Sequence, residues 1–306
     1  MGKNREFESM GFDNEPFFSV IIPTLKRPSR RLQNCLEALA GQSFRSFEII
    51  VVDDGSDFPP GEIVGNFADR LDVQLVLNNR LGPASARNLG AKMAKGKMLA
   101  FTDDDCEPAP DWLQKMADSI VITKESNIAL GGRTVNVMNN NLFSIASQCL
   151  ISYLYSYFQN RPGRFFTTNN IVLPVKLFGE IGGFDYRIPF AAEDRDLFDR
   201  WQYMGYGMQY IQEAVVYHKH SFTLFSYLKQ HMAYGQGAFF YHRLRSGRKH
   251  LPINIDQKKF YLGMMRFPFS HFRNIKATLI VLLLVISQVA YAIGYFFEWG
   301  RKPLHK

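Results

Sequence analysis

Five carboxylates, in two groups, are the side chains of this chain that point most directly to chemistry. Asp103, Asp104 and Asp105 follow the apolar run 97–102, and the acidic pair Glu193-Asp194 comes about ninety residues later. Three adjacent negative charges repel one another, so a positive charge must lie near this Asp triplet. Alternate side chains of an extended segment point the same way. We therefore expect Asp103 and Asp105 to share one Mg²⁺ or Mn²⁺ ion, while Asp104 faces elsewhere.

The elements that position these carboxylates follow from the pattern of apolar residues. The pattern predicts strands at 18–22, 47–52, 73–77 and 98–102, with helices at 28–39 and 83–95 between them. Short apolar strands that alternate with helices indicate an α/β fold with a parallel sheet covered on both faces. Ligands of such sheets bind beyond the carboxyl ends of the strands. The Asp triplet lies at such an end.

A second acidic motif, Asp53-Asp54-Gly55-Ser56, ends another of these predicted strands. Asp and Gly favour turns for backbone reasons alone, which accounts for the motif about as well as ligand binding does. The alternative is that a carboxylate here accepts hydrogen bonds from a base or a ribose. Arg87, in the small-residue segment 82–88, suits either a phosphate or an ion pair with a nearby Asp.

The pair Glu193-Asp194 opens a predicted helix near Ala191. Asp194 is a candidate general base that removes the proton of an attacking hydroxyl. Acidic residues also stabilise the first turn of a helix, where Asp196 lies as well, so the residues alone leave both interpretations open.

Several motifs together resemble the family 2 glycosyltransferases of GT-A fold. They cover about two-thirds of the chain, from about Ser19 to His220, in the expected order: SVIIPTLKRP, EIIVVDDGSD, PASARNLGAKMAKGKMLAFTDDDCEP, TTNNIVLP, IGGFDYR and AAEDRDLFDRW. The resemblance implies a Rossmann-like, mostly parallel sheet with flanking helices. It also implies transfer of a sugar from a nucleotide diphosphate donor, with inversion at the anomeric carbon.

The resemblance assigns roles to individual residues. Asp54 matches the position that reads the nucleobase, usually uracil; Asp103 and Asp105 match the metal-binding DxD motif; and Asp194 matches the catalytic base. A His beyond the acidic pair faces the metal or the diphosphate in this family, and we prefer His218 to His220. The remaining expected contacts are Pro23, Thr24, Asp53, Arg87 and Asp104 on the donor side, and Asn170, Phe184, Asp185 and Glu193 on the acceptor side. A buried Phe184 behind the Gly182-Gly183 turn is the structural alternative.

One departure from the family concerns processivity. Polymerising members carry QxxRW after the acidic pair, whereas this chain has Gln230-His231-Met232-Ala233-Tyr234, without the Arg and the Trp. We therefore expect a non-processive enzyme that adds one sugar.

The C-terminal part predicts attachment to a membrane. Residues 277–297 carry no charge over 21 residues, long enough for one transmembrane helix, although a buried core helix is the alternative. Residues 241–276 hold nine Lys or Arg and one acidic residue, a net charge of +8 that equals the formal charge of the whole chain. This location favours anionic lipid at the cytoplasmic face over nucleic acid as the partner. The segment 224–245 has an amphipathic pattern that suits the membrane interface, and packing on the catalytic domain is the equal alternative.

These features give the expected organisation and location. We expect an N-terminal tail at 1–16, a GT-A domain at 17–222, a basic amphipathic juxtamembrane region at 223–276, a transmembrane helix at 277–299 and a tail at 300–306. The charged N-terminus is no signal peptide, and three unevenly spaced cysteines predict no disulfide framework. We expect a single-pass anchor at the cytoplasmic face and an acceptor that is a polyprenyl-linked glycan or a glycolipid.

Three other classes of protein fit part of the pattern. A glycoside hydrolase uses two carboxylates but needs neither the Asp triplet nor a nucleotide pocket. A sugar nucleotidyltransferase shares the sheet and the metal, but the segment after the first strand, 23–27, is not glycine-rich. A catalytically silent membrane scaffold would keep the fold and bind nucleotide without turnover.

Overall fold

The computed structural model describes residues 15–26, 29–123, 125–248, 253 and 255–301. The chain forms two compact units. The first contains the residues up to Thr134, Thr167–Gly183 and Tyr206–Tyr217, and the second contains Val135–Phe166, Phe184–Gly205 and the chain from His218. Most of the predicted N-terminal tail, 1–16, lies outside the described residues. The segment boundaries expected from the sequence remain a prediction.

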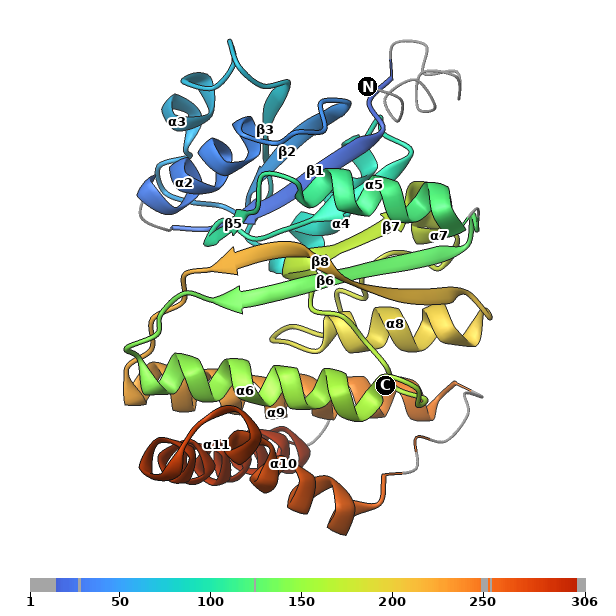
Figure 1. The fold of residues 1–306 in the computed structure, drawn as a ribbon. Coiled ribbons are helices and arrows are strands. Elements are labelled where there is room, and N and C mark those ends of the chain that lie inside the picture. The colour runs from blue at the N-terminus through green and yellow to red at the C-terminus, as the bar shows by residue number, and fades with distance from the viewer. Residues whose placement is uncertain (1–14, 27–28, 124, 249–252, 254, 302–306) are drawn as a thin grey trace. The chain divides into compact units, whose positions relative to one another are not determined.

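An eight-stranded sheet is the centre of the first unit, with the strand order β3-β2-β1-β4-β7-β6-β8-β5 (Figure 1). Helices lie between consecutive strands, except between β4 and β5. The elements are β1 (Phe18–Thr24), α2 (Ser29–Ala40), β2 (Phe47–Asp53), α3 (Gly61–Gly65), β3 (Val73–Leu77), α4 (Pro83–Met93), β4 (Met98–Phe101), β5 (Cys106–Pro108), α5 (Trp112–Thr123), β6 (Ile128–Asn136), η1 (Thr168–Asn170), β7 (Ile171–Pro174), α7 (Val175–Glu180) and β8 (Gly207–His218).

Alternate residues of the central strands are buried on opposite faces of this sheet. Val20 and Ile22 of β1 belong to a core with residues of α2, α3 and α5. On the other face a Cβ at Gly90 of α4 would lie 2.6 Å from Ile21 Cγ2 and 3.1 Å from Val52 Cγ2, so this glycine lets α4 approach the sheet closely. Strands covered on both faces read as continuous apolar runs, which explains the pattern of the sequence.

The predicted α/β fold is confirmed, with a difference in the second half of the sheet. The predicted strands match β1 to β4, and β1 pairs in parallel with both β2 and β4. β7, however, pairs antiparallel with β4 and with β6. The sheet is therefore parallel on the side that carries the acidic motifs and mixed beyond β4.

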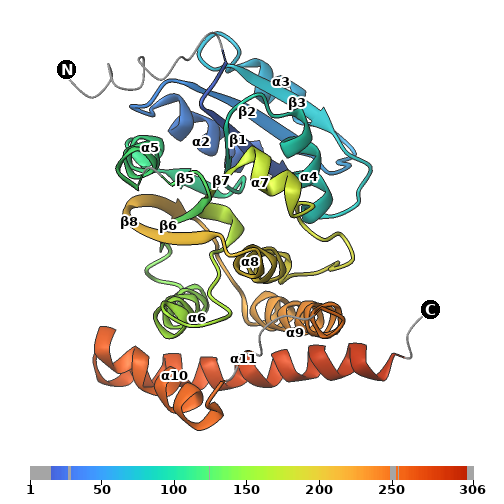
Figure 2. The same cartoon turned by 90° about the vertical axis from the view of Figure 1, so that its right-hand side faces the viewer.

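The second unit is built mainly of helices: α6 (Leu142–Phe158), α8 (Glu193–Tyr203), α9 (Leu224–Ser246), α10 (Gln257–His271) and α11 (Asn274–Gly300). α10 and α11 form one layer of this unit beside a layer of α6 and α9 (Figure 2). Tyr153 of α6 holds α10, since its hydroxyl donates to the carbonyl of Phe260 at 2.6 Å.

α11 extends the predicted transmembrane segment at both ends. Among the described residues, only Ile275–Gly300 of α11 is long and apolar enough to cross a membrane. The predicted basic amphipathic region consists of two separate helices, α9 and α10.

Candidate active site

The Asp triplet lies in a turn, not in an extended segment. β4 ends at Phe101, and the backbone N–H of Cys106 donates to the carbonyl of Asp103 at 3.1 Å, which closes a four-residue turn. The expected extended backbone at the triplet is therefore wrong, and alternation along a strand is no reason for Asp103 and Asp105 to point the same way. The three carboxylates do follow the end of β4, as the sequence predicts. The backbone there forms a turn because the chain reverses into β5 and the three charges repel one another.

Each carboxylate of the triplet has a different partner. Asp103 accepts from Arg87 Nη2 at 2.7 Å, and Asp105 accepts from Arg31 Nη1 at 3.3 Å. Asp104 is buried and accepts from Thr24 Oγ1 at 2.7 Å. Arg87 lies on α4 and Arg31 on α2, which cover opposite faces of the sheet, so a cation flanks the turn on each side. Arg31 was not expected from the sequence.

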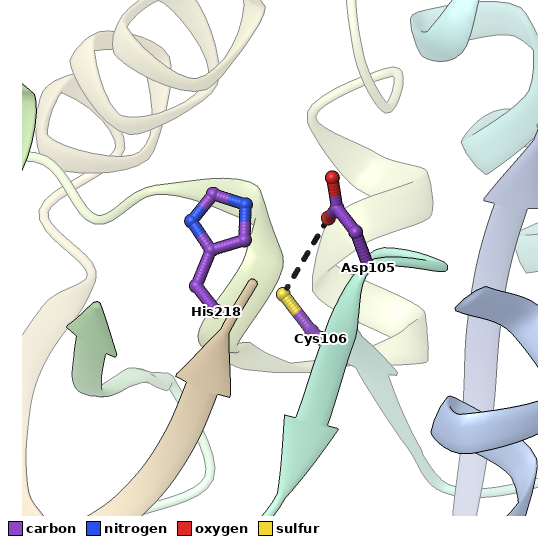
Figure 3. Close-up of side chains that lie close together, drawn as sticks. All are labelled: Asp105, Cys106 and His218. Carbon is purple, nitrogen blue, oxygen red and sulfur yellow. Dashed lines mark hydrogen bonds between the residues drawn. The ribbon is translucent and has the colours of Figure 1, made fainter. Parts of the chain in front are cut away.

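His218 and Cys106 belong to the surroundings of Asp105. His218 is the last residue of β8, a strand whose other residues are part of the first unit. One donor atom each of Asp105, Cys106 and His218 lie within 4.8 Å of one another (Figure 3). Cys106 Sγ lies 3.9 Å from Asp105 Oδ1 and donates to it. These residues bring together donor atoms of three kinds at the end of the turn.

The chemistry of this donor set fits a divalent cation. Burial, followed by the charges of Asp103 and Asp105, raises the pKa of Cys106 well above its usual value, so the thiol keeps its proton and is a poor ligand for a hard cation. Carboxylate oxygens suit Mg²⁺ and Mn²⁺, whereas an imidazole nitrogen suits first-row transition metals better than Mg²⁺. A site with His218 therefore favours Mn²⁺.

Asp53 and Asp54 organise the neighbouring loops. Asp53 accepts from the N–H of Ser56 at 3.0 Å and closes the turn that the sequence indicates. Asp54 is buried and accepts from Asn78 Nδ2 at 2.7 Å and from the N–H groups of Leu81 and Gly82 at 3.0 and 2.9 Å. An ionised carboxylate has about four lone-pair sites, so Asp54 can hold this loop and still accept a bond from a base.

Two residues expected on the acceptor side are buried. The Asn170 amide accepts from Trp112 Nε1 at 2.8 Å and donates to the carbonyls of Arg133 and Ala214 at 3.2 and 3.1 Å. It therefore connects α5, β6 and β8. Phe184 is 1% exposed, which agrees with the alternative that this side chain is buried behind the Gly182-Gly183 turn. Their contact with an acceptor stays a prediction.

The acidic pair opens α8 in the second unit. Glu193 and Asp194 are half-buried, and Asp194 Oδ1 accepts from the N–H of Arg195 at 2.7 Å. Ala192, the residue before the helix, has a φ of +75°, a conformation that non-glycine residues rarely adopt. A Cβ at Gly237 of α9 would lie 1.9 Å from the Ala191 carbonyl oxygen, so α9 supports this strained segment by direct backbone contact.

Ion pairs hold the rest of α8. Asp196, fully buried, accepts from Arg248 Nη1 at 2.6 Å and pairs with Arg200 at 2.8 Å, and Asp199 pairs with Arg245 at 2.8 Å. The same Arg248 lies 3.4 Å from Asp185. Burial acts to raise the pKa of Asp185, but hydrogen bonds and charge from Arg187 outweigh it and lower that pKa. The pairing gives Asp185 and Asp196 structural roles that spacing in the sequence did not show.

Comparison with known proteins adds a family to this geometry. The profile described as "Glycosyl transferase family 2" matches residues 19–188, more than half of the chain. Glycosyltransferase AglE of Haloferax volcanii is 36% identical over 110 residues, which cover 34% of this chain and 36% of that protein. Chondroitin synthase of Escherichia coli is 25% identical over 238 residues, 66% of this chain and 34% of that protein. The chain thus spans about a third of the length of these curated relatives.

Solved structures share the fold. The mannosyltransferase PcManGT from Pyrobaculum calidifontis, in complex with GDP-Man and Mn²⁺, superposes with a TM-score of 0.66 at 16% identity over 94% of this chain and 88% of that one. TarS 1–349 of S. aureus in complex with UDP-GlcNAc gives a TM-score of 0.53 at 16% identity over 94% and 93%. At such identities the likeness concerns the fold alone.

Proposed function

The chain belongs to the family 2 glycosyltransferases, and we propose that it transfers a single sugar from a nucleotide diphosphate sugar to an acceptor hydroxyl, with inversion at the anomeric carbon. The observation that carries this proposal is the Asp triplet at the carboxyl end of β4, flanked by Arg31 and Arg87. The profile match from 19 to 188 covers this whole region. Ligands of parallel sheets bind at this edge.

The first unit provides the donor side. Pro23 and Thr24 end β1, where Thr24 pairs in register with Asp53 of β2. Asp53 and Asp54 shape the adjacent loops, and Asp54 retains acceptor capacity for a base N–H, in our proposal that of uracil. Arg87 is paired with Asp103 and lies close enough to the triplet to bind a phosphate when a cation takes over the carboxylates. Asp104 fixes the turn to Thr24.

We propose that Asp103, Asp105 and His218 hold a divalent cation, with Mn²⁺ preferred to Mg²⁺. Two of the solved structures of this fold contain Mn²⁺, PcManGT and GalNAc-T7, the latter in complex with UDP and GalNAc. When bound, the cation stabilises the negative charge that develops on the diphosphate leaving group.

The second unit provides the catalytic base. We propose that Asp194 accepts the proton of the acceptor hydroxyl as that oxygen attacks the anomeric carbon and the bond to the diphosphate breaks. Its place in the first turn of α8 also suits an acidic side chain, because the N-terminus of a helix interacts favourably with negative charge. Glu193, Phe184, Asp185 and Asn170 are the proposed surroundings of the acceptor.

The acceptor follows from the C-terminal helices. An enzyme attached to a membrane reaches hydroxyls that are presented at the membrane surface. The proposed acceptor is therefore a polyprenyl-linked glycan or a glycolipid at the cytoplasmic face, where a basic segment meets anionic lipid. The absence of QxxRW supports addition of one sugar instead of polymerisation.

Nucleotide binding tests the donor site directly. In calorimetry on detergent-solubilised protein we expect one of UDP, GDP and dTDP to bind in the presence of Mn²⁺. Asp103→Asn/Asp105→Asn should weaken that binding by at least about a hundredfold, because both proposed carboxylate ligands are lost. The control Asp111→Asn/Asp118→Asn, which removes two carboxylates at α5, should bind as the wild type does. Folded protein that binds none of the three nucleotides would contradict the donor site.

Turnover tests the base. With the conjugate sugar nucleotide and a lipid extract of the producing cells, Asp194→Asn should bind the nucleotide normally and lose about 10²- to 10⁴-fold in kcat. A wild-type protein that binds nucleotide but releases no diphosphate under these conditions would instead favour the scaffold interpretation.

A further inference from the structure

The two sides of α11 differ in an unusual way. Every exposed residue between Leu279 and Phe297 is apolar: Leu279, Leu282, Val285, Ile286, Val289, Ile293, Phe296 and Phe297. The polar residues Ser287 and Glu298 lie on the buried side. Burial recurs at 277, 280, 284, 287, 290, 294 and 298, which is the spacing of a helix packed along one stripe. One face of α11 therefore belongs to the protein, and the other is an uncovered apolar strip.

The buried stripe is fastened to α9 over most of its length. Tyr227 donates its hydroxyl proton to the carbonyl of Leu283 at 3.0 Å, and Gln236 Nε2 donates to Glu298 Oε1 at 2.7 Å. Between these bonds a Cβ at Gly294 would lie 2.0 Å from the carbonyl oxygen of Met232. Backbone contact of this kind leaves no room for lipid between the two helices. If α11 crossed a bilayer, α9 would have to enter it as well.

α9 is unsuited to a hydrocarbon environment. It carries the exposed side chains of Lys229 and Arg243, and Arg245 pairs with Asp199. Its Gly235 contacts α11, whereas Gly237, two residues on, contacts Ala191 beside the acidic pair. A single helix, about 10 Å wide, therefore separates α11 from charged residues of α8. Placing such charges at the centre of a bilayer is strongly unfavourable, so a spanning orientation of α11 conflicts with its packing.

α10 adds positive charge beside the apolar strip. Its exposed residues include Leu262, Met265 and Phe269, with the cations Lys258, Lys259 and Arg266 among them. Arg273 and Lys276 continue the basic series at the start of α11. From 256 to 276 the only acidic residue is Asp256, which pairs with Lys259 at 3.3 Å. Exposed apolar residues that alternate with cations match the interface of an anionic bilayer.

We propose that α10 and α11 lie in the plane of an anionic phospholipid membrane, with the apolar strip of α11 inserted to the level of the acyl chains and the cations of α10 at the headgroups. The attachment is thus monotopic, in place of the single membrane crossing that the length of the segment indicates. This inference rests on the part of the proposed function that places the chain at a membrane, and not on sugar transfer.

Vesicle binding tests the surface. The purified full chain is mixed with sucrose-loaded vesicles of phosphatidylcholine, with or without 30% phosphatidylglycerol, at about 0.1 M salt, and bound protein is sedimented. Ile286→Asp/Ile293→Asp should lower the affinity for anionic vesicles by at least about a hundredfold, because two charges enter the inserted strip. Ile122→Asp, at an exposed isoleucine of α5, is the matched control and should bind as the wild type does.

The basic residues are tested in the same assay. Lys258→Gln/Lys259→Gln/Arg266→Gln should weaken binding to anionic vesicles on the order of a hundredfold and leave binding to neutral vesicles unchanged. Neutralising three cations of the first unit, Lys92→Gln/Lys115→Gln/Lys176→Gln, should have little effect. Equal binding of the wild type to both kinds of vesicle would overturn the role of α10.

Labelling distinguishes the two orientations of α11. The three native cysteines are buried, so a cysteine introduced at Lys276 or at Gly300, one at each end of α11, is the accessible thiol. On sealed vesicles with protein added from outside, a membrane-impermeant maleimide should label both variants to the same extent. Protection of one end until detergent is added would overturn the in-plane orientation.

Nucleotide binding is measured on the same preparations. A protein that binds nucleotide but not vesicles would contradict only the proposed membrane surface. A protein that binds vesicles but not nucleotide would contradict only the proposed donor site. The two proposals therefore fail independently.

Discussion

At the residue scale, compensation of charge at the Asp triplet explains how the fold tolerates three adjacent carboxylates. Arg87 and Arg31 pair with the outer two, and the hydroxyl of Thr24 donates to the middle one. The two arginines come from helices on opposite faces of the sheet. The helices that cover the sheet therefore provide the positive charge that balances the carboxylates of the turn. A cation that binds here must compete with these pairs, which in the proposed function would release Arg87 for a phosphate.

His231 of α9 gives a prediction about pH. Its ring lies against Tyr227 and Tyr234, and its Nε2 has no hydrogen-bond partner among the described residues. Burial lowers the pKa of His231 to about 4 from an ordinary 6.5. The unfolded chain therefore binds a proton at a higher pH than the folded one. The free energy of unfolding should therefore show no loss from His231 above pH 6.5, and it should fall by up to about 3 kcal/mol as the pH decreases to 4.

Guanidinium unfolding in detergent, between pH 4 and 8, measures this effect. His231→Phe should remove that share of the pH dependence, whereas the exposed control His271→Gln should keep it. An identical pH profile for His231→Phe and the wild type would show that another group is responsible.

Sequence reasoning at this scale found the acidic motifs but not their geometry. The triplet was recognisable because three adjacent carboxylates at the end of an apolar strand repel one another, and Asp54 because it follows another strand at the same edge of the sheet. The turn at Asp103 and the pairing of Asp105 with Arg31 were not, because they depend on how helices from distant parts of the chain meet the sheet edge.

At the element scale, α9 connects two features of the second unit. Gly235 contacts the backbone of α11 and Gly237 contacts Ala191, and Gln236 between them binds Glu298. The sequence Gly235-Gln236-Gly237 therefore allows one helix to approach two neighbours at backbone distance. The interfacial position expected for 224–245 stays a prediction, and several residues of α9, among them Tyr227, His231 and Tyr241, are buried.

Gly237→Ala tests the support of the acidic pair. The added Cβ would lie 1.9 Å from the Ala191 carbonyl oxygen. Because that oxygen belongs to the backbone, the clash can be relieved only if the backbone of α9 or of the segment before α8 moves. Displacement of the strained Ala192 and the following Asp194 should lower kcat by about 10²-fold and stability by about 1–3 kcal/mol, with nucleotide affinity unchanged.

Gly179→Ala is the matched control for this substitution. Nothing lies within 4 Å of a Cβ at Gly179, which is also helical, so kcat and stability should be equal to or above those of the wild type. Normal kcat in Gly237→Ala, with the fold intact, would show that α9 does not position Asp194.

At the scale of the whole molecule, β1 to β4 and the helices α2 and α4 could be predicted from the sequence, because strands buried on both faces produce uninterrupted apolar runs. The short helix α3 was not predicted. The antiparallel pairing of β7 could not, since pairing depends on connections that periodicity does not reveal. The C-terminal segment illustrates the same limit: its length and composition fit a membrane crossing, but only the side chains that α9 covers show which face is free.

The covered face leads to a prediction about truncation. If α10 and α11 were a detachable anchor, removing them would leave a soluble catalytic chain. In the structure they cover α6 and α9 through Tyr153 with Phe260, and through Gly235 with Tyr291. Ending the chain at Arg248 should therefore expose an apolar face of the second unit, lower the Tm in detergent by more than about 5 °C and cause aggregation without detergent.

The full-length Ile286→Asp/Ile293→Asp variant, which alters only the exposed strip, should keep the wild-type Tm. A truncated chain that stays monomeric and as stable as the wild type would show that these helices serve only as an anchor, since the packing that ties α11 to α9 would then contribute nothing to the fold.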